Sequence, residues 1–460
     1  MIRDEKSTDN PINSPPGNRH DRLQTSLSGR AMSMVMVHIT GIGMAYGLQL
    51  VLTRWMGATS YGAYIYVYSW ATTAALITRL GLPEAMIRFI PAYRANNDTA
   101  HLRGLMRWSH RMVVRTSFVF ALLASTVIMV LARTDGLEHV GIWILGAWFV
   151  PVLSLVKLRS ESLRAAQRYI WTYVPVLILR PLLMLSGTAI LIYAGFNLTG
   201  TWVMIFVVGA FAVVLLIQTI VTRKTFLPAT SEPRPQYDHR QWLDVALPLL
   251  LVALFILSVN QADILMLGFL ADTRAVGLYR VATRVATLVS FPLAMFNIVL
   301  APTISSTFAR AGSSDLQRIV RSASRRIFWA SLLLSLLVFF FADPLLRLFG
   351  PEFPEALWGL RALAAAHFVN ACTGPVAHLL NFTGHQRESA RVYGFAALIN
   401  LMLNIIGIPY FGILGAALAL ALTFVIRNVW LYVLVVRKLG VHAFFLAGRT
   451  SSTGHDGAAP

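Results

Sequence analysis

Apolar stretches of about 17 to 26 residues follow one another along nearly the whole chain. About 20 apolar residues cross a bilayer as a helix, and lipid cannot satisfy free backbone groups, so such spans must be helical. Only 13% of the 460 residues are charged, against about 25% in soluble domains. We therefore expect an all-α integral membrane protein with about twelve spans, at residues 31–53, 60–82, 113–132, 140–156, 170–194, 201–221, 242–267, 277–302, 327–342, 357–380, 392–408 and 414–436.

The basic residues gather in alternate connections between these spans. One set of connections, which includes both termini, holds 28 Lys and Arg residues, and the opposite set holds only 4. By the positive-inside rule, both termini are expected in the cytoplasm. The net charge of +19 therefore reflects topology, and we expect no nucleic-acid partner. The usage of 35 Arg to 4 Lys with abundant Ala indicates a GC-rich bacterial genome, so we expect a multi-pass protein of a bacterial inner membrane.

Two parts of the chain resemble each other. Gly62–Ala63–Tyr64 and Gly277–Leu278–Tyr279 each follow a short outer loop and open the second span of a six-span half. Parallel repeats of this kind are common in transporters, where the substrate site lies between the halves. We expect a six-helix lobe at 31–221, a cytoplasmic linker at 222–241, and a second six-helix lobe at 242–436 around a central cleft. The ends, 1–30 and 437–460, read as disordered cytoplasmic tails.

Sequence signals for an enzyme are absent. There is no G-x-x-x-x-G-K-[ST] for an ATP-driven pump, no D-x-D pair, and no His/Cys cluster with metal-ligand spacing. The single Cys372 excludes an internal disulfide. We expect a protein that is not an enzyme and has no metal or cofactor.

Charged residues inside the hairpin of spans seven and eight need an explanation, because charge within a membrane is costly. Counted from the turn at residue 272, Asp263 and Arg280 lie at similar depths, about 12 to 14 Å along their helices. One interpretation is an Asp263–Arg280 pair that braces the hairpin. However, one acid cannot neutralise both Arg280 and Arg284, and arginine suits phosphate oxygens. The second interpretation is therefore a site for an anionic substrate.

Other polar residues could line the same cleft. Arg180 and Arg361 could extend the cationic lining, although Arg361 could also reach an interface, and Arg54 could cap a helix or form a gate. Asp263 could couple transport to an ion, as could His367 and His378, which an unbroken helix would place on one face; packing is the alternative role for the histidines. The remaining candidates for the lining are Asn260, Gln261 and Asn370, and Asn400 and Asn404 could face the cleft or bond neighbouring helices. Three further span arginines need no function because they lie near a cytoplasmic end: Arg79, Arg115 and Arg427.

Several stretches, in order, are similar to one family. They include "LTRWMGATSYGAY" from residue 52, "NQADILMLGFLADTRAVGLYRVATR" from 260, "LAPTISSTFARAGSSDLQRIVRSASR" from 300, "LRLFGPEFPEA" from 346, "LLNFTGHQRES" from 379 and "YFGILGAALALALT" from 410. The chain resembles the Wzx-type polysaccharide and O-antigen flippases of the multidrug/oligosaccharidyl-lipid/polysaccharide exporter superfamily.

The resemblance implies a twelve-helix protein that moves an undecaprenyl-pyrophosphate-linked oligosaccharide from the inner to the outer leaflet by alternating access, with or without ion coupling. It implies partners in the bilayer and in the pathway, such as a polymerase or chain-length regulator. One chain with two lobes needs no second copy to form a cleft. A multidrug or cation antiporter of the same superfamily is the alternative function, and a membrane-bound glycan polymerase or ligase is a weaker one.

Overall fold

The computed structural model describes residues 16–134, 139–226 and 234–442, with side chains at 36–134, 139–226, 234–259, 261–297, 317–381 and 383–442. Every regular element in these residues is a helix, which confirms the all-α class. Eight of the described helices are long and apolar enough to cross a membrane. The chain is therefore a multi-pass membrane protein.

The elements follow in this order: α1 (Pro16–Thr78), α2 (Leu82–Ala95), α3 (Thr99–Thr134), α4 (Val140–Ala165), α5 (Tyr169–Val174), the π-helix η1 (Pro175–Leu179), α6 (Arg180–Tyr193), α7 (Gly200–Phe226), α8 (His239–Leu270), α9 (Thr273–Thr287), the 3₁₀ turn η2 (Leu288–Ser290), α10 (Phe291–Phe340), α11 (Ala342–Arg347), the 3₁₀ turn η3 (Phe353–Ala356), α12 (Leu357–Cys372), α13 (Val376–Phe382) and α14 (Gln386–Leu439).

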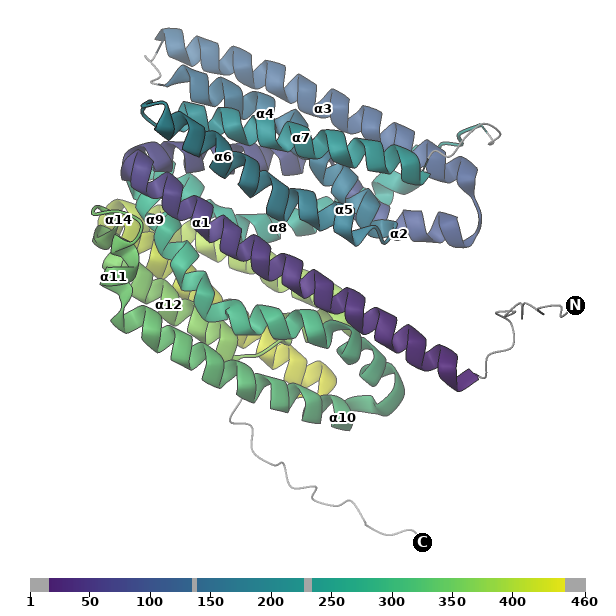
Figure 1. Cartoon of the computed structure of the whole chain (residues 1–460). Helices are drawn as coiled ribbons and strands as arrows, with labels where there is room; N and C mark the ends of the chain where they lie inside the picture. Colours follow the sequence, from purple (N-terminus) through teal and green to yellow (C-terminus); the bar gives the residue numbers. More distant parts are fainter. Residues whose placement is uncertain (1–15, 135–138, 227–233, 443–460) are drawn as a thin grey trace, which may run out of the picture.

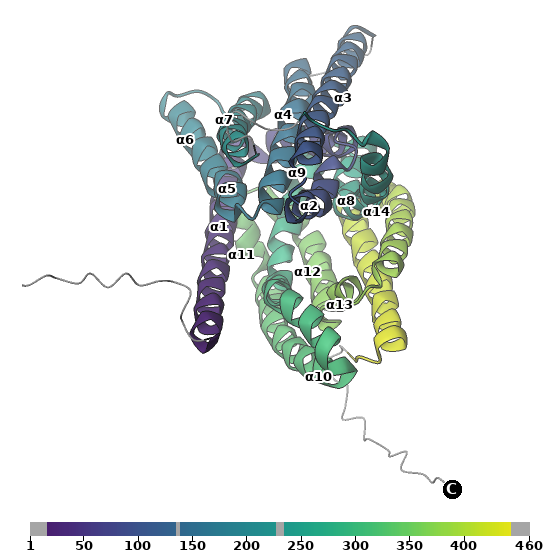
Figure 2. The ribbon, with the colours of Figure 1, turned by 90° about the vertical axis from the view of Figure 1, so that its right-hand side faces the viewer.

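The helices form two groups with further helices between them. Figures 1 and 2 show α3, α4, α6 and α7 packed together on one side and α10, α12 and α13 on the other. Between these groups, α9 packs against both α1 and α12, and α8 packs against both α1 and α14. The side chains of α1, α4, α7, α9, α12 and α14 contribute to one continuous apolar core. Helices from both parts of the chain thus share the centre of the molecule.

Two glycines bend the longest helices where connections were expected. Gly57 interrupts α1 with a φ of 72°, and Gly412 interrupts α14 with a φ of 53°. Positive φ is the region that glycine enters without a steric penalty. The breaks fall between the predicted first and second spans and between the eleventh and twelfth. The total of twelve spans and the division into two lobes stay predictions.

Several predicted boundaries are different in the structure. Helix α1 begins at Pro16, a residue type favoured in the first turn, so residues 16–30 are helical and not an unstructured tail. The predictions for 1–15 and 443–460 lie outside the described residues. The tenth span is not one helix: it breaks between α12 and α13, because Gly374 has a φ of 69° and Pro375 has no N–H to continue the helix. Helix α10 instead runs unbroken through the predicted loop at 303–326.

Helices α1 and α9 touch backbone to backbone at two glycines. A Cβ atom added at Gly62 would overlap the carbonyl oxygen of Thr273, and one added at Gly277 would overlap the carbonyl oxygen of Ala58. Small residues let membrane helices approach this closely, where dispersion contacts and backbone dipoles supply the attraction. The close approach fixes α9 beside α1, although they lie more than 200 residues apart in sequence.

Polar contacts reinforce this junction at the turn between α8 and α9. Arg274 makes a two-pronged ion pair with Glu355, with both N–O distances at 2.6 Å. These hydrogen bonds raise the pKa of Arg274 above its ordinary value. Glu352 accepts a hydrogen bond of 3.3 Å from the backbone N–H of Ala58, directly after the Gly57 break. We call this set of contacts the Glu352–Glu355 latch.

We predict that Gly62→Ala destabilises the protein, because the added methyl group must push α1 and α9 apart. Overpacking of this kind typically costs about 1–3 kcal/mol. The measurement is the thermal midpoint of the purified protein in detergent. Gly47→Ala is the matched control, since it lies in the same helix with no heavy atom within 4 Å of the added Cβ. Equal midpoints for the two variants would contradict the proposed role of the glycine contact.

Candidate functional site: an arginine cavity between two parts of the chain

A cavity of about 190 Å³ lies between α1, α6, α7 and α9. Three of the predicted substrate-binding residues line it: Arg180 from α6, and Arg280 and Arg284 from α9. We call it the arginine cavity. Because α9 is held against α1 by the glycine contact, side chains more than 200 positions apart in sequence face one space.

Tyr46 of α1 holds Arg284 in place. The Tyr46 hydroxyl donates a 2.6 Å hydrogen bond to the carbonyl oxygen of Arg284. The Arg284 guanidinium lies over the Tyr46 ring, 4.5 Å from its centroid, which is a cation–π contact. Arg280 lies one turn earlier on the same face of α9. Tyr46 is a neutral partner, so it positions Arg284 without cancelling its charge.

An irregular stretch of helix presents Arg180. The π-helix η1 begins at Pro175 and ends directly before Arg180, and Pro181 follows. Pro175 has no N–H, so the carbonyl oxygen of Trp171, four residues earlier, lacks its usual hydrogen-bond donor. Gln218 of α7 replaces the donor, with Nε2 3.3 Å from the Trp171 oxygen. Short π segments of this kind often occur at functional sites.

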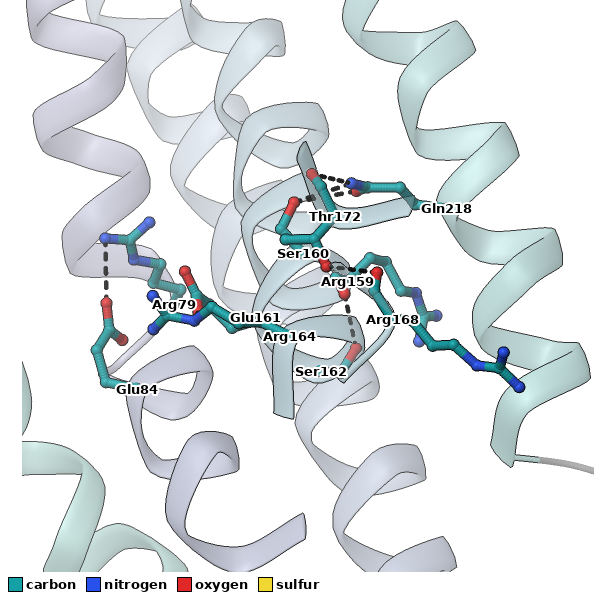
Figure 3. A network of polar contacts seen from close by, with 10 residues as sticks. All are labelled: Arg79, Glu84, Arg159, Ser160, Glu161, Ser162, Arg164, Arg168, Thr172 and Gln218. Carbon is teal, nitrogen blue, oxygen red and sulfur yellow. Dashed lines mark hydrogen bonds and ion pairs between the residues drawn. The ribbon is translucent and has the colours of Figure 1, made fainter. Parts of the chain in front are cut away.

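Figure 3 shows Gln218 reaching across from its own helix to Ser160 and Thr172. Gln218 and Ser160 are 3.0 Å apart, from Gln218 Nε2 to Ser160 Oγ. This buried network ties α7 to α4 and α5 beside η1. The local bend that carries Arg180 is therefore supported by hydrogen bonds from two neighbouring helices.

The three arginines of the cavity differ from two arginines of the first half that pair with acids. Arg79 lies 3.4 Å from Glu84 and Arg164 lies 2.7 Å from Glu161 (Figure 3). None of the ion pairs found among the described side chains involves Arg180, Arg280 or Arg284. The Arg180 guanidinium contacts the Phe211 ring at 5.2 Å, and its Nε has no hydrogen-bond partner in the described structure. The cavity thus concentrates positive charge that protein carboxylates do not neutralise.

The predicted Asp263–Arg280 pair is wrong. Asp263 is 3% exposed and accepts hydrogen bonds from two neutral donors, the Tyr279 hydroxyl at 2.7 Å and Asn404 Nδ2 at 2.7 Å. Tyr279 directly precedes Arg280 on α9, so the neighbouring side chain points in a different direction and meets the acid instead. Asp263 therefore joins α8, α9 and α14 and leaves the charge of Arg280 free to face the cavity.

Two other predicted binding residues lie away from the cavity. Arg361 lies against Phe339 and Trp358, with ring-centroid distances of 5.0 and 4.9 Å, and both rings are largely exposed. The placement of Arg361 at a membrane interface stays a prediction. Arg54 is exposed, and its Nε donates to the carbonyl oxygen of Leu348 at 2.7 Å. That oxygen is at the end of α11, where a cation is favourable.

The polar residues of α12 form a separate buried group. Asn370 Oδ1 accepts hydrogen bonds from Arg427 Nη2 at 2.9 Å and from Asn428 Nδ2 at 3.0 Å. His367 bonds Ser290 through Nδ1 at 2.9 Å. His378 lies on α13, beyond the helix break. The prediction that His367 and His378 share one face of an unbroken helix is therefore wrong.

Sequence reasoning missed the position of Arg427. It is only 8% exposed, and its guanidinium lies 4.3 Å from the Phe424 ring. It lies ten residues before Arg437, about 15 Å along the helix, a depth that could have argued against snorkelling. Of the remaining candidates, Gln261 is half-buried and the side chain of Asn260 lies outside the described part of the structure.

Known proteins resemble the chain in sequence over part of its length. Two archaeal relatives from Haloferax volcanii match: a probable low-salt glycan biosynthesis flippase, Agl15, at 29% identity over 172 residues, and a probable flippase, AglR, at 30% over 193 residues. The matches cover 36% and 40% of this chain, and only 36% and 38% of the two relatives.

Solved structures share the fold. An inward-facing multidrug resistance MATE family transporter superposes with a TM-score of 0.70 at 13% identity, over 87% of this chain and 94% of that one. The inward closed conformation of the lipid II flippase MurJ gives a TM-score of 0.65 at 14% identity, over 88% and 86%. At these identities the likeness establishes the fold alone.

Family matches complete the comparison. The MatE family matches residues 248–406, and the polysaccharide biosynthesis protein family matches residues 30–308. The expected resemblance to the exporter superfamily is confirmed by these matches together with the flippase relatives and the shared fold. Since the second match spans more than half of the chain, the protein belongs to the polysaccharide biosynthesis protein family.

Proposed function

We propose that the protein is a flippase for a lipid-linked oligosaccharide whose lipid carries a pyrophosphate, and that the arginine cavity binds this pyrophosphate. The observation that carries the proposal is that three arginines line one cavity and that none of them pairs with an acid among the described side chains. Guanidinium groups bind phosphate oxygens through paired, charge-assisted hydrogen bonds. The names of the two archaeal relatives and the family's link to polysaccharide biosynthesis support the same substrate class.

We further propose the predicted topology: twelve spans in two six-helix lobes, 31–221 and 242–436, joined by the linker 222–241, with both termini in the cytoplasm of a bacterium. The positive-inside pattern supports this orientation, and it places the Glu352–Glu355 latch on the outer side. Arg180 then belongs to the first lobe and Arg280 and Arg284 to the second. Rocking of the lobes around the cavity would expose it alternately to the two leaflets.

A multidrug antiporter is the second candidate, since the MatE family matches part of the chain. A pocket for organic cations requires acidic residues, whereas the charged residues lining the arginine cavity are arginines. The polarity of the cavity therefore favours an anionic substrate.

The substrate stays in the bilayer by its lipid tail, and a single chain supplies both walls of the site. A polymerase or chain-length regulator of the same pathway is a proposed further partner.

Transfer measurements in proteoliposomes test the anion site. We expect Arg284→Gln, Arg280→Gln and Arg180→Gln each to slow transfer of a fluorescent undecaprenyl-pyrophosphate oligosaccharide, read with a membrane-impermeant quencher. A charge-assisted hydrogen bond contributes about 1.5–3 kcal/mol, so the loss should be about tenfold or more.

Arg361→Gln is the matched control, because Arg361 has the same chemistry but lies outside the cavity. Its transfer rate should stay within about twofold of the wild type, as expected for a surface cation–π contact. The binding proposal would be abandoned if all four variants behaved alike. Wild-type rates no higher than those of empty vesicles would instead remove the flippase function.

Asp263 has a bracing role in this proposal. Asn404→Leu leaves one carboxylate oxygen of the buried Asp263 without its donor, which should lower the free energy of unfolding by about 1–3 kcal/mol. Arg280→Gln should change it little, because Arg280 is not the partner of Asp263. Thermal or denaturant unfolding in detergent compares the two variants. A larger loss for Arg280→Gln would restore the ion-pair interpretation.

The alternative role of Asp263, ion coupling, has a separate readout. Under that role, Asp263→Asn would remove any dependence of transfer on an imposed proton or sodium gradient while the protein stays folded. Under the bracing role, transfer and stability fall together and the response to the gradient is unchanged.

A further inference from the structure

One wall of the arginine cavity is neutral. It comes from α1, on both sides of the Gly57 break, and consists of Gln49, Tyr61, Tyr64 and Tyr68. The three tyrosines are spaced by three and four residues, so they lie on one face of the helix. Their rings form a ladder, with centroids 6.2 Å apart between Tyr61 and Tyr64 and 5.9 Å apart between Tyr64 and Tyr68. We call these four residues the neutral wall.

The neutral wall faces the arginines across the same space. Tyr61 lies within electrostatic range of Arg280 and Arg284, and Tyr64 lies within range of Arg180 and Arg280. A ligand held by the arginines would therefore have its next chemical group beside α1.

One buried polar atom of the neutral wall has no hydrogen-bond partner within the described structure. Gln49 is 8% exposed, and its Nε2 makes no hydrogen bond to any described residue. Tyr61 and Tyr64 line the same cavity, and no hydrogen bond joins their hydroxyls to the described residues. Two other phenols near the arginines are engaged: Tyr46 donates to the carbonyl oxygen of Arg284 and Tyr279 donates to Asp263.

This difference points to a ligand. Buried polar groups in proteins are nearly always hydrogen-bonded, because an unpaired one costs free energy. A phenol both donates and accepts, and an amide does the same. Sugar hydroxyls and acetamido groups have the same dual character, whereas phosphate oxygens only accept and are better served by arginine. The cavity thus has one side suited to a pyrophosphate and another suited to a sugar.

We propose that Gln49, Tyr61 and Tyr64 bind the sugar unit attached directly to the pyrophosphate and determine which glycan is accepted. This inference rests on the proposed flippase function and adds a specificity site to it. The sugar bonded directly to a pyrophosphate held by the arginines is the unit that lies beside the neutral wall of this cavity of about 190 Å³. Only the first sugar would therefore be recognised, and the rest of the glycan would extend beyond the cavity.

The specificity argument has a physical basis. A site built to hydrogen-bond a substrate hydroxyl discriminates strongly against a ligand that lacks it, because the site's own buried groups are then left unpaired. The neutral wall contributes little to binding of the bare pyrophosphate lipid, since it carries no charge. Changes to the neutral wall should therefore alter glycan recognition and leave pyrophosphate binding unchanged.

The experiment compares two lipids on the full-length protein in detergent. One is undecaprenyl pyrophosphate carrying a labelled oligosaccharide, and the other is undecaprenyl pyrophosphate alone, measured by competition. We expect Tyr64→Phe, Tyr61→Phe and Gln49→Leu each to weaken binding of the glycan lipid by roughly threefold to tenfold, the effect of one neutral hydrogen bond. Binding of the bare lipid should not change.

Two controls make the result specific. Tyr66→Phe removes a hydroxyl from the same helix, but Tyr66 packs edge-on against Trp143 at 5.5 Å and does not line the cavity, so it should leave both lipids unaffected. Arg284→Gln should weaken both lipids together. Thermal midpoints of all variants establish that each is folded.

The outcomes separate the two proposals. Tyrosine and glutamine variants that bind both lipids like the wild type would overturn the sugar site and leave the flippase proposal intact. So would variants that weaken both lipids equally, which would assign the neutral wall to the pyrophosphate. A wild-type protein that binds neither lipid would overturn the proposed function and the sugar site with it.

Discussion

The backbone contact between α1 and α9 is the constraint on which the rest of the structure depends. Gly62 and Gly277 have no side chain, so the two helices approach until a Cβ atom would overlap the opposite backbone. This approach brings Arg280 and Arg284 of α9 to face the tyrosines of α1 and Arg180 of α6. A larger residue at either glycine would push the two helices apart. The residues that line the cavity would then no longer face one another.

Separation of acids from arginines gives the cavity its chemistry. Asp263 lies at nearly the same depth as Arg280, yet Tyr279 and Asn404 satisfy both of its oxygens. Glu352 and Glu355 bind at the latch, and Glu84 and Glu161 pair with arginines elsewhere in the first half. These five acids are therefore already engaged. Burying unneutralised arginines in a membrane protein costs free energy, and an anionic ligand would offset that cost.

The helical class, the presence of many apolar spans and the three arginines of the cavity could be predicted from the sequence, because they depend on composition and on helix periodicity. The Gly57 and Gly412 breaks also fell within predicted connections. Partner choice could not be predicted, since it depends on side-chain direction: spacing brought Asp263 and Arg280 to equal depth, but Tyr279 points at the acid. Gly374 and Pro375 indicate a helix break, but the apolar run around them was interpreted as one span. The burial of Arg427 was not predicted, because its distance from the cytoplasmic end of the helix was taken to be short enough for snorkelling.

The division of the cationic lining between the two parts of the chain bears on release as well as binding. A pyrophosphate held by three fixed arginines would dissociate slowly, and a transporter must release its substrate after each passage. Arg180 lies on α6, before the linker, whereas Arg280 and Arg284 lie on α9, after it. In the proposed cycle, any movement that separates α9 from α1 also separates the cations, because the Gly62–Gly277 contact is what joins them. The affinity for the anion would then fall without any change in protonation, since a ligand contacted by fewer arginines loses charge-assisted hydrogen bonds. The same contact that assembles the site can therefore, by opening, let the substrate go.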